Sequence, residues 1–279
     1  MTAAEKRALE VKASRPPREP RDPSHERQQI EDRTTEEWID EGSVRDVAMD
    51  AAERGASVEA VENKKRREAK PLDPEVTSEM VDVLGQQRGA RLAERLAQAS
   101  EALDRERYQE ARRITTSIAK EAPSVAAVHE VLGLASYRLG KYKQAASALE
   151  VAQELHPNPS MLPILADCHR AQARWSAVDR VWAEIRESSP PQEVLAEGRI
   201  VVAGALADRG DLAGAIDLMS SVKKSPKVVR DHHLRQWYVL ADLYDNVGDP
   251  IESRKWFSKL AQHDPNYEDV QQRLRTVGR

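Results

Sequence analysis

Residues 126–159 carry the feature that most constrains the fold, a pattern of small and large apolar residues typical of two antiparallel helices. We expect Leu132 and Leu149 to pack between the two helices. Gly133 has no side chain, so the helix axes can approach to roughly 8–10 Å. Gly140 suits the left-handed residue that ends a first helix. One such hairpin cannot cover its own apolar face, so this segment predicts neighbouring hairpins.

Neighbouring hairpins are indicated because three markers recur in one phase, in steps close to 34 residues that lengthen toward the C-terminus. The position after the inter-helix turn recurs at Tyr108, Tyr142, Trp175, Leu212 and Pro250. The small position three residues later recurs at Ala111, Ala145, Val178, Ala215 and Ser253. A proline that closes the second helix recurs at Pro123, Pro157, Pro190, Pro226 and Pro265.

These markers resemble the tetratricopeptide repeat, whose pattern is W-x2-L-G-x2-Y…A-x3-F…P. His129 stands where that pattern has Trp, and Ser136 where it has Tyr. The last unit matches best in its first helix, with Trp237, Leu240, Ala241 and Tyr244, followed by Phe257 and Pro265. The resemblance implies an all-α, right-handed solenoid of about five helical hairpins, at about 92–125, 126–159, 159–192, 196–229 and 234–267.

The first 72 residues differ from the repeats. Residues 1–33 mix prolines with charges of both signs and predict a disordered tail, because almost nothing there can be buried. Residues 34–72 predict a linker with two short amphipathic helices, which begin at the capping pairs Thr34/Glu37 and Ser43/Asp46. Three interpretations stay open for these helices: they fold on a partner, dock on the chain's own repeats, or form only transiently.

Residues 73–279 form the predicted solenoid, with a capping helix at each end. Asp73 as N-cap and Pro74 at the first helical position predict a helix over 74–88 that packs on the first repeat. The segment from Tyr267 to Leu274 predicts a second capping helix on the last repeat.

Composition limits the function classes. The mean hydropathy is −0.68 and only 4% of residues are aromatic, which is too polar for one compact core over 279 residues. A net charge of −4 shows no strong bias toward nucleic acid or anionic membrane. The single cysteine, Cys168, permits no intrachain disulfide. With no signal segment and no long apolar run, we expect a cytoplasmic protein without membrane association.

Motifs of catalysis and cofactor binding are absent from the sequence: there is no glycine-rich phosphate loop, HExxH, CxxC or nucleophile elbow. We expect His169, next to Cys168, to be a packing residue, and His232 and His233 to lie in a surface loop between repeats. The sequence therefore predicts no enzyme, no catalytic residue, no metal and no cofactor.

The family resemblance implies a concave groove, lined by the first helix of each repeat, that binds a peptide or protein. The corresponding positions are Leu96, Ser100, Leu103, Glu130, Leu134, Tyr137, Arg138, Asp167, Arg170, Ile200, Ala207, Asp208, Tyr238, Asp242 and Asp245. We expect Tyr137 and Tyr238 to be exposed aromatic anchors. An excess of acid toward the C-terminal end favours a basic or amphipathic partner segment.

Four segments, 38–46, 128–149, 163–171 and 199–210, are similar to a group of actinobacterial tetratricopeptide proteins with a charged N-terminal tail. The leading hypothesis is a non-enzymatic adaptor. The alternative is association with RNA or ribosomes through Lys64, Lys65, Arg66 and Arg67, together with Arg15, Arg18, Arg21 and Arg27. Binding that falls steeply with salt would identify the alternative.

Overall fold

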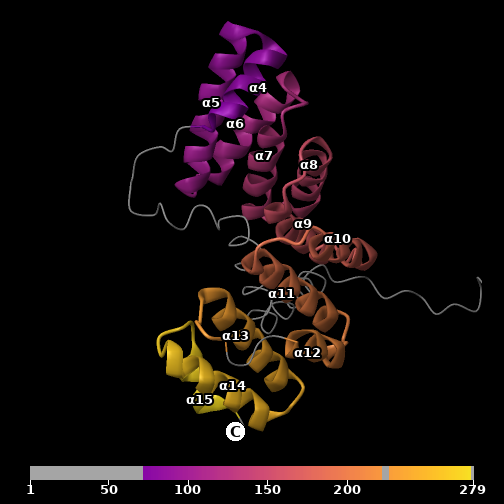
Figure 1. The fold of residues 1–279 in the computed structure, drawn as a ribbon, viewed down its shortest axis with the longest axis vertical. Helices are drawn as coiled ribbons and strands as arrows, with labels where there is room; N and C mark the ends of the chain where they lie inside the picture. The colour runs from indigo at the N-terminus through magenta and orange to yellow at the C-terminus, as the bar shows by residue number, and fades with distance from the viewer. Residues whose placement is uncertain (1–71, 222–225, 278–279) are drawn as a thin grey trace, which may run out of the picture. The chain divides into compact units, whose positions relative to one another are not determined.

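The computed structural model describes residues 72–221 and 226–277, and within these ranges it is all-α with no strand. The helices follow one another as consecutive hairpins, with one further helix before them and one after (Figure 1). Their bounds are α4 Pro74–Leu84, α5 Gln86–Asp104, α6 Tyr108–Glu121, α7 Ala126–Arg138, α8 Tyr142–Leu155, α9 Leu162–Arg170, α10 Trp175–Glu187, α11 Gln192–Asp208, α12 Leu212–Ser220, α13 Asp231–Asn246, α14 Pro250–His263 and α15 Val270–Thr276. This architecture confirms the predicted helical solenoid.

The turn inside every hairpin has the same backbone conformation. The residue two positions before the second helix has a positive φ in all five hairpins: Glu106 (61°), Gly140 (68°), Ala173 (53°), Gly210 (80°) and Gly248 (82°). Glycine adopts this conformation without steric cost, whereas glutamate and alanine do not. The backbone thus repeats even where the residue type departs from the pattern.

Close packing inside a hairpin depends on small residues, as residues 126–159 predict. A Cβ added to Gly133 on α7 would lie 2.7 Å from the Leu149 side chain of α8, closer than carbon atoms approach. Leu149 is fully buried. The same apolar cluster also contains Leu162, Ile185 and Val201, which belong to the next two hairpins. Adjacent hairpins therefore share their core, because none of them covers its own apolar face.

The two terminal helices lie against the first and last hairpins. The predicted helix over 74–88 is wrong at its end, because α4 stops at Leu84 and α5 begins at Gln86. Gly85 separates the two helices with φ 80° and ψ 160°. The start is as expected, since the Asp73 carboxylate accepts the Glu75 backbone N–H at 2.8 Å. At the other end, Val270 of α15 is buried against the last hairpin.

The expectations for residues 1–71, a disordered tail and a linker with two short helices, concern residues outside those that the structure describes.

Candidate functional site

The predicted groove residues lie on the first helices of the hairpins, α5, α7, α9, α11 and α13, but they divide into two groups by burial. The buried group is Leu96, Tyr137, Asp167, Arg170, Ile200, Tyr238 and Asp242. The group with partial or full exposure is Ser100, Leu103, Glu130, Leu134, Arg138, Ala207, Asp208 and Asp245. Seven of the fifteen predicted contact residues are therefore buried and serve the fold itself.

Both tyrosines expected as exposed anchors are buried, so this expectation is wrong. Tyr137 on α7 is 0% exposed, and its hydroxyl donates a hydrogen bond to Asp167 on α9 at 2.7 Å. Tyr238 on α13 is 3% exposed, and its hydroxyl donates to Asp269, before α15, at 2.7 Å. Burial, together with the neighbouring carboxylate, raises the pKa of each phenol. Each tyrosine joins its repeat to the next element along the chain.

The carboxylate of Asp167 also accepts a bond from Arg170, whose Nε lies 2.7 Å from Asp167 Oδ1. Arg170 Nη1 reaches the next hairpin and donates to Asp208 at 2.7 Å. Burial opposes the charge of Arg170, but the two carboxylates outweigh it and raise the pKa of the guanidinium. A chain of charge-assisted bonds thus links α7, α9 and α11.

The predicted excess of acid at the C-terminal end of the groove is countered by the chain itself. Arg273 of α15 forms an ion pair with the buried carboxylate of Asp242, and its Nη1 lies 3.5 Å from Asp245. The sequence reasoning missed Arg273 and Asp269 as groove partners. One signal was present, since Asp269 follows Tyr238 by 31 residues, close to the spacing between Tyr137 and Asp167.

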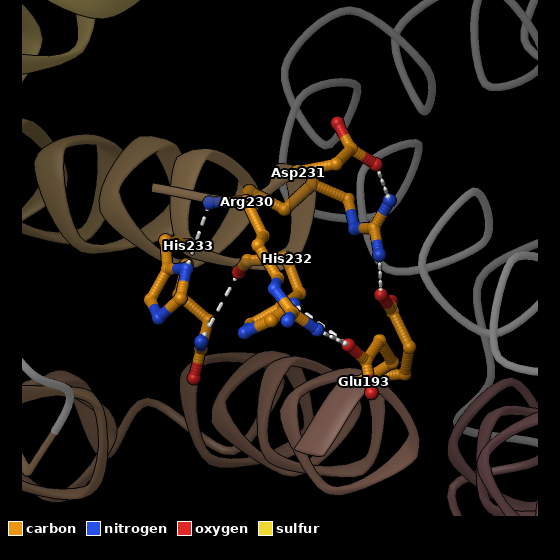
Figure 2. A network of polar contacts seen from close by, with 8 residues as sticks. Glu193, Arg230, Asp231, His232 and His233 are labelled. Carbon is orange, nitrogen blue, oxygen red and sulfur yellow. Dashed lines mark hydrogen bonds and ion pairs between the residues drawn. The ribbon is translucent and has the colours of Figure 1, made fainter. Parts of the chain in front are cut away.

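A second polar network joins α11 to α13 (Figure 2). Glu193 of α11 accepts a hydrogen bond from Arg230 at 3.2 Å and lies 3.6 Å from His232 Nδ1. Arg235 of α13 forms ion pairs with Glu197 of α11 and with Asp231. Glu197 and Arg235 are both buried.

His232 and His233 were expected in a surface loop, and this expectation is wrong. Helix α13 begins at Asp231, and His233 Nδ1 accepts the backbone N–H of Arg230 at 3.1 Å, which caps the helix. His232 is buried, and burial lowers its pKa to about 4 despite the opposing effect of Glu193. The ring is therefore neutral at pH 7.

Cys168 and His169 lie side by side in α9 and are both 0% exposed. Burial raises the pKa of the Cys168 thiol and lowers that of His169 to about 4. Glu150 Oε1 lies 3.5 Å from His169 Nε2, but this carboxylate is partly in water and does not keep the ring charged. The pair is a packing element, as the sequence predicts for His169.

The accessible part of the predicted groove lies mainly on the first two hairpins. Ser100 and Leu103 of α5 and Leu134 of α7 are partly exposed. Arg138, at the end of α7, is exposed, and its guanidinium stacks on Tyr108 at 4.7 Å from the ring centroid. Helices α5 and α7 contact each other, so Leu103 and Leu134 lie on neighbouring helices.

Other predicted features give no site within the described part of the chain. No cluster of three potential metal ligands occurs in residues 72–221 and 226–277. No helix in those ranges is both long and apolar enough to cross a lipid bilayer. The basic cluster Lys64, Lys65, Arg66 and Arg67, and the N-terminal arginines, lie outside the described residues.

The stacked hairpins define a helical-repeat protein. Residues 96–159 match the family model of the tetratricopeptide repeat, and this match, together with the common turn geometry of the five hairpins, supports a tetratricopeptide-repeat protein. A search of curated proteins found no match to the chain. Tetratricopeptide repeats generally mediate protein–protein interaction and are typically not enzymes.

Proposed function

We propose that the protein is a non-enzymatic cytoplasmic adaptor that holds a segment of a partner protein on the first helices of its repeats. The observation that supports this proposal is that the family match and the accessible leucines of the predicted groove lie in the same part of the chain. Residues 96–159, which match the tetratricopeptide family, include the C-terminal part of α5 and all of α6, α7 and α8. Leu103 and Leu134, the two accessible leucines of the predicted groove, lie in the same two hairpins.

The contact surface that we propose is smaller than the groove that the sequence predicts. In the later hairpins, Asp167, Arg170 and Asp242 are buried in bonds within the chain, so a partner would have to break those bonds to use them. Breaking a buried ion pair by removing one partner costs roughly 3–5 kcal/mol. Leu103 and Leu134 need no such exchange. They suit an aliphatic side chain on a helical or extended partner segment.

A photo-crosslinking amino acid at position 134 tests the proposal. We expect it to capture a partner protein that the same group at position 155 does not capture. Leu155, an exposed leucine at the end of α8, is the matched control because it lies on a second helix. The identified partner is then titrated calorimetrically with Leu103→Ala, Leu134→Ala and Leu155→Ala.

The first two substitutions should each weaken binding about tenfold, which corresponds to roughly 1.4 kcal/mol, and Leu155→Ala should leave it unchanged. Equal crosslinking from both positions, or equal loss in all three variants, would refute the assignment of the surface. Binding that weakens steeply as salt is added would instead indicate a nucleic-acid partner. Tyr137→Ala is unsuitable here, because Tyr137 is buried and its removal disturbs the fold.

A further inference from the structure

A pocket of about 330 Å³ lies beside the C-terminal half of α10 and the N-terminal half of α11, outside the predicted groove positions. Trp182, Pro190 and Leu195 provide apolar wall, and the side chains of Arg186 and Arg199 also line it. The guanidinium of Arg186 lies over the Trp182 ring, 5.6 Å from its centroid. The lining contains two positive charges and no carboxylate.

Arg199, which is partly buried, lacks the carboxylate partner that a positive charge shielded from water normally has. Its Nη1 donates to the neutral amide of Gln236 at 2.8 Å, but its Nε is buried without a hydrogen-bond partner. No ion pair to a carboxylate is found for Arg199 within residues 72–221 and 226–277. Burial lowers its pKa, because the guanidinium has lost water without gaining an opposite charge. By contrast, Arg170 and Arg235 each bind two carboxylates.

We infer that this pocket binds an acidic side chain, aspartate or glutamate, of a partner peptide, together with an adjacent aliphatic residue. Arg199 and Arg186 supply donors for the carboxylate, because a guanidinium presents its N–H groups in a fork that matches two carboxylate oxygens. Trp182 and Leu195 supply the surface for the aliphatic side chain. The incoming carboxylate gives the partly buried Arg199 guanidinium the opposite charge that the described part of the chain does not provide.

The size of the pocket supports a peptide fragment. Ligand pockets occupy roughly 300–1,000 Å³, and this one stands at the lower end, which fits one or two side chains. This inference rests on the proposed function, because it assumes a protein partner and adds the chemistry of one segment of it. The test uses defined peptides, so the pocket inference can fail while the groove proposal holds. The groove proposal can likewise fail while the pocket inference holds.

The experiment is a titration of full-length protein with acetyl-Ala-Leu-Asp-Ala-amide and with its Asn counterpart, followed by the indole N–H resonance of Trp182 in NMR spectra. Loss of the resonance in Trp182→Phe gives its assignment. We expect a saturable shift with the Asp peptide and at least tenfold weaker binding of the Asn peptide. Arg199→Met should abolish the shift. Arg113→Met, which removes an equal charge from an exposed site on α6, should preserve it.

Thermal unfolding separates a ligand-binding arginine from a structural one. Without peptide, Arg199→Met should unfold at the same temperature as the wild type or higher, because it removes a partly buried charge that has no opposite charge beside it. A lower melting temperature would show that the fold needs the guanidinium, and would overturn the inference. Equal shifts with acetate or inorganic phosphate would mean a simple anion site and would also overturn it. Leu134→Ala should leave the Asp-peptide titration unchanged.

Discussion

The two buried histidines predict that the protein loses stability in mild acid. His169 and His232 have pKa values of about 4 in the folded state, below the ordinary value of 6.5. Their folded-state pKa values are depressed, so the unfolded chain binds more protons than the folded one between about pH 6.5 and pH 4. The neutral rings therefore favour folding above about pH 6.5, and this contribution is lost as the pH falls through that window.

The size of the effect follows from the shifts. Each histidine has a pKa of 6.5 in the unfolded chain and about 4 in the folded one. At about pH 5, such a residue lowers the free energy of unfolding by roughly 2 kcal/mol relative to about pH 8. Two such residues give a loss of roughly 4 kcal/mol. Carboxylates contribute little in this range, because their pKa values mostly lie lower.

Urea unfolding followed by circular dichroism at about pH 8 and about pH 5 measures this loss, and His169→Phe is the test variant. Phenylalanine fills a similar volume and removes two ring nitrogens that have no hydrogen-bond partner. The variant should lose only about half as much stability as the wild type. Because repeat proteins do not always unfold in one step, the slope of each transition must also be compared. An equal loss of stability in the wild type and in His169→Phe would refute the reasoning. So would a His169 ring that titrates near its ordinary pKa.

Three further substitutions test the repeats. Ala173→Gly should stabilise the protein by about 0.5–1 kcal/mol in urea unfolding, because Ala173 has a φ of 53°. Gly140→Ala, at the same turn position of another hairpin, should destabilise the protein by a similar amount. Effects of the same sign in the two variants would contradict the common turn geometry. Arg273→Gln should destabilise the last hairpin and α15 by roughly 3 kcal/mol, because it leaves the Asp242 carboxylate buried without its guanidinium. Hydrogen exchange should show the loss concentrated in α13–α15, and a uniform change over all described helices would count against this account.

The hairpins were predictable from sequence because the decisive signals are local and repeated. A small residue at Gly133, a left-handed residue at Gly140 and a leucine at Leu149 each act within one hairpin. The break at Gly85 was missed, although the apolar positions of α4 end at Leu84 and the next residues are Gly85, Gln86 and Gln87. The helical start at Asp231 was missed, because its cap uses a histidine ring, which is outside the usual set of capping side chains.

The exposure of the groove was harder to predict, because it depends on side chains about one repeat away. The repeat phase places Tyr137 and Asp167 correctly on first helices, but it does not show that they bond to each other. The same holds for Tyr238, whose partner Asp269 belongs to the segment before the capping helix. A polar residue on the predicted inner face is therefore either a partner contact or a link between repeats, and only the spatial arrangement distinguishes them.

Within residues 72–221 and 226–277, buried arginines that join adjacent hairpins occur in the later hairpins, at Arg170 and Arg235, and this difference supports the proposed binding surface. Between the first two hairpins, the small residues Ala102, Ala111 and Ala135 form an apolar contact against which Leu103 packs. Alanine side chains are too short to cover their surroundings, so Leu103 stays partly exposed. In the later hairpins, long arginine side chains such as Arg170 reach across and bury the polar groups that they bind. On the first helices, apolar groove surface for a partner is therefore available at the first end, whereas at the later end a partner that uses Asp167, Arg170 or Asp242 would break bonds that the fold already uses.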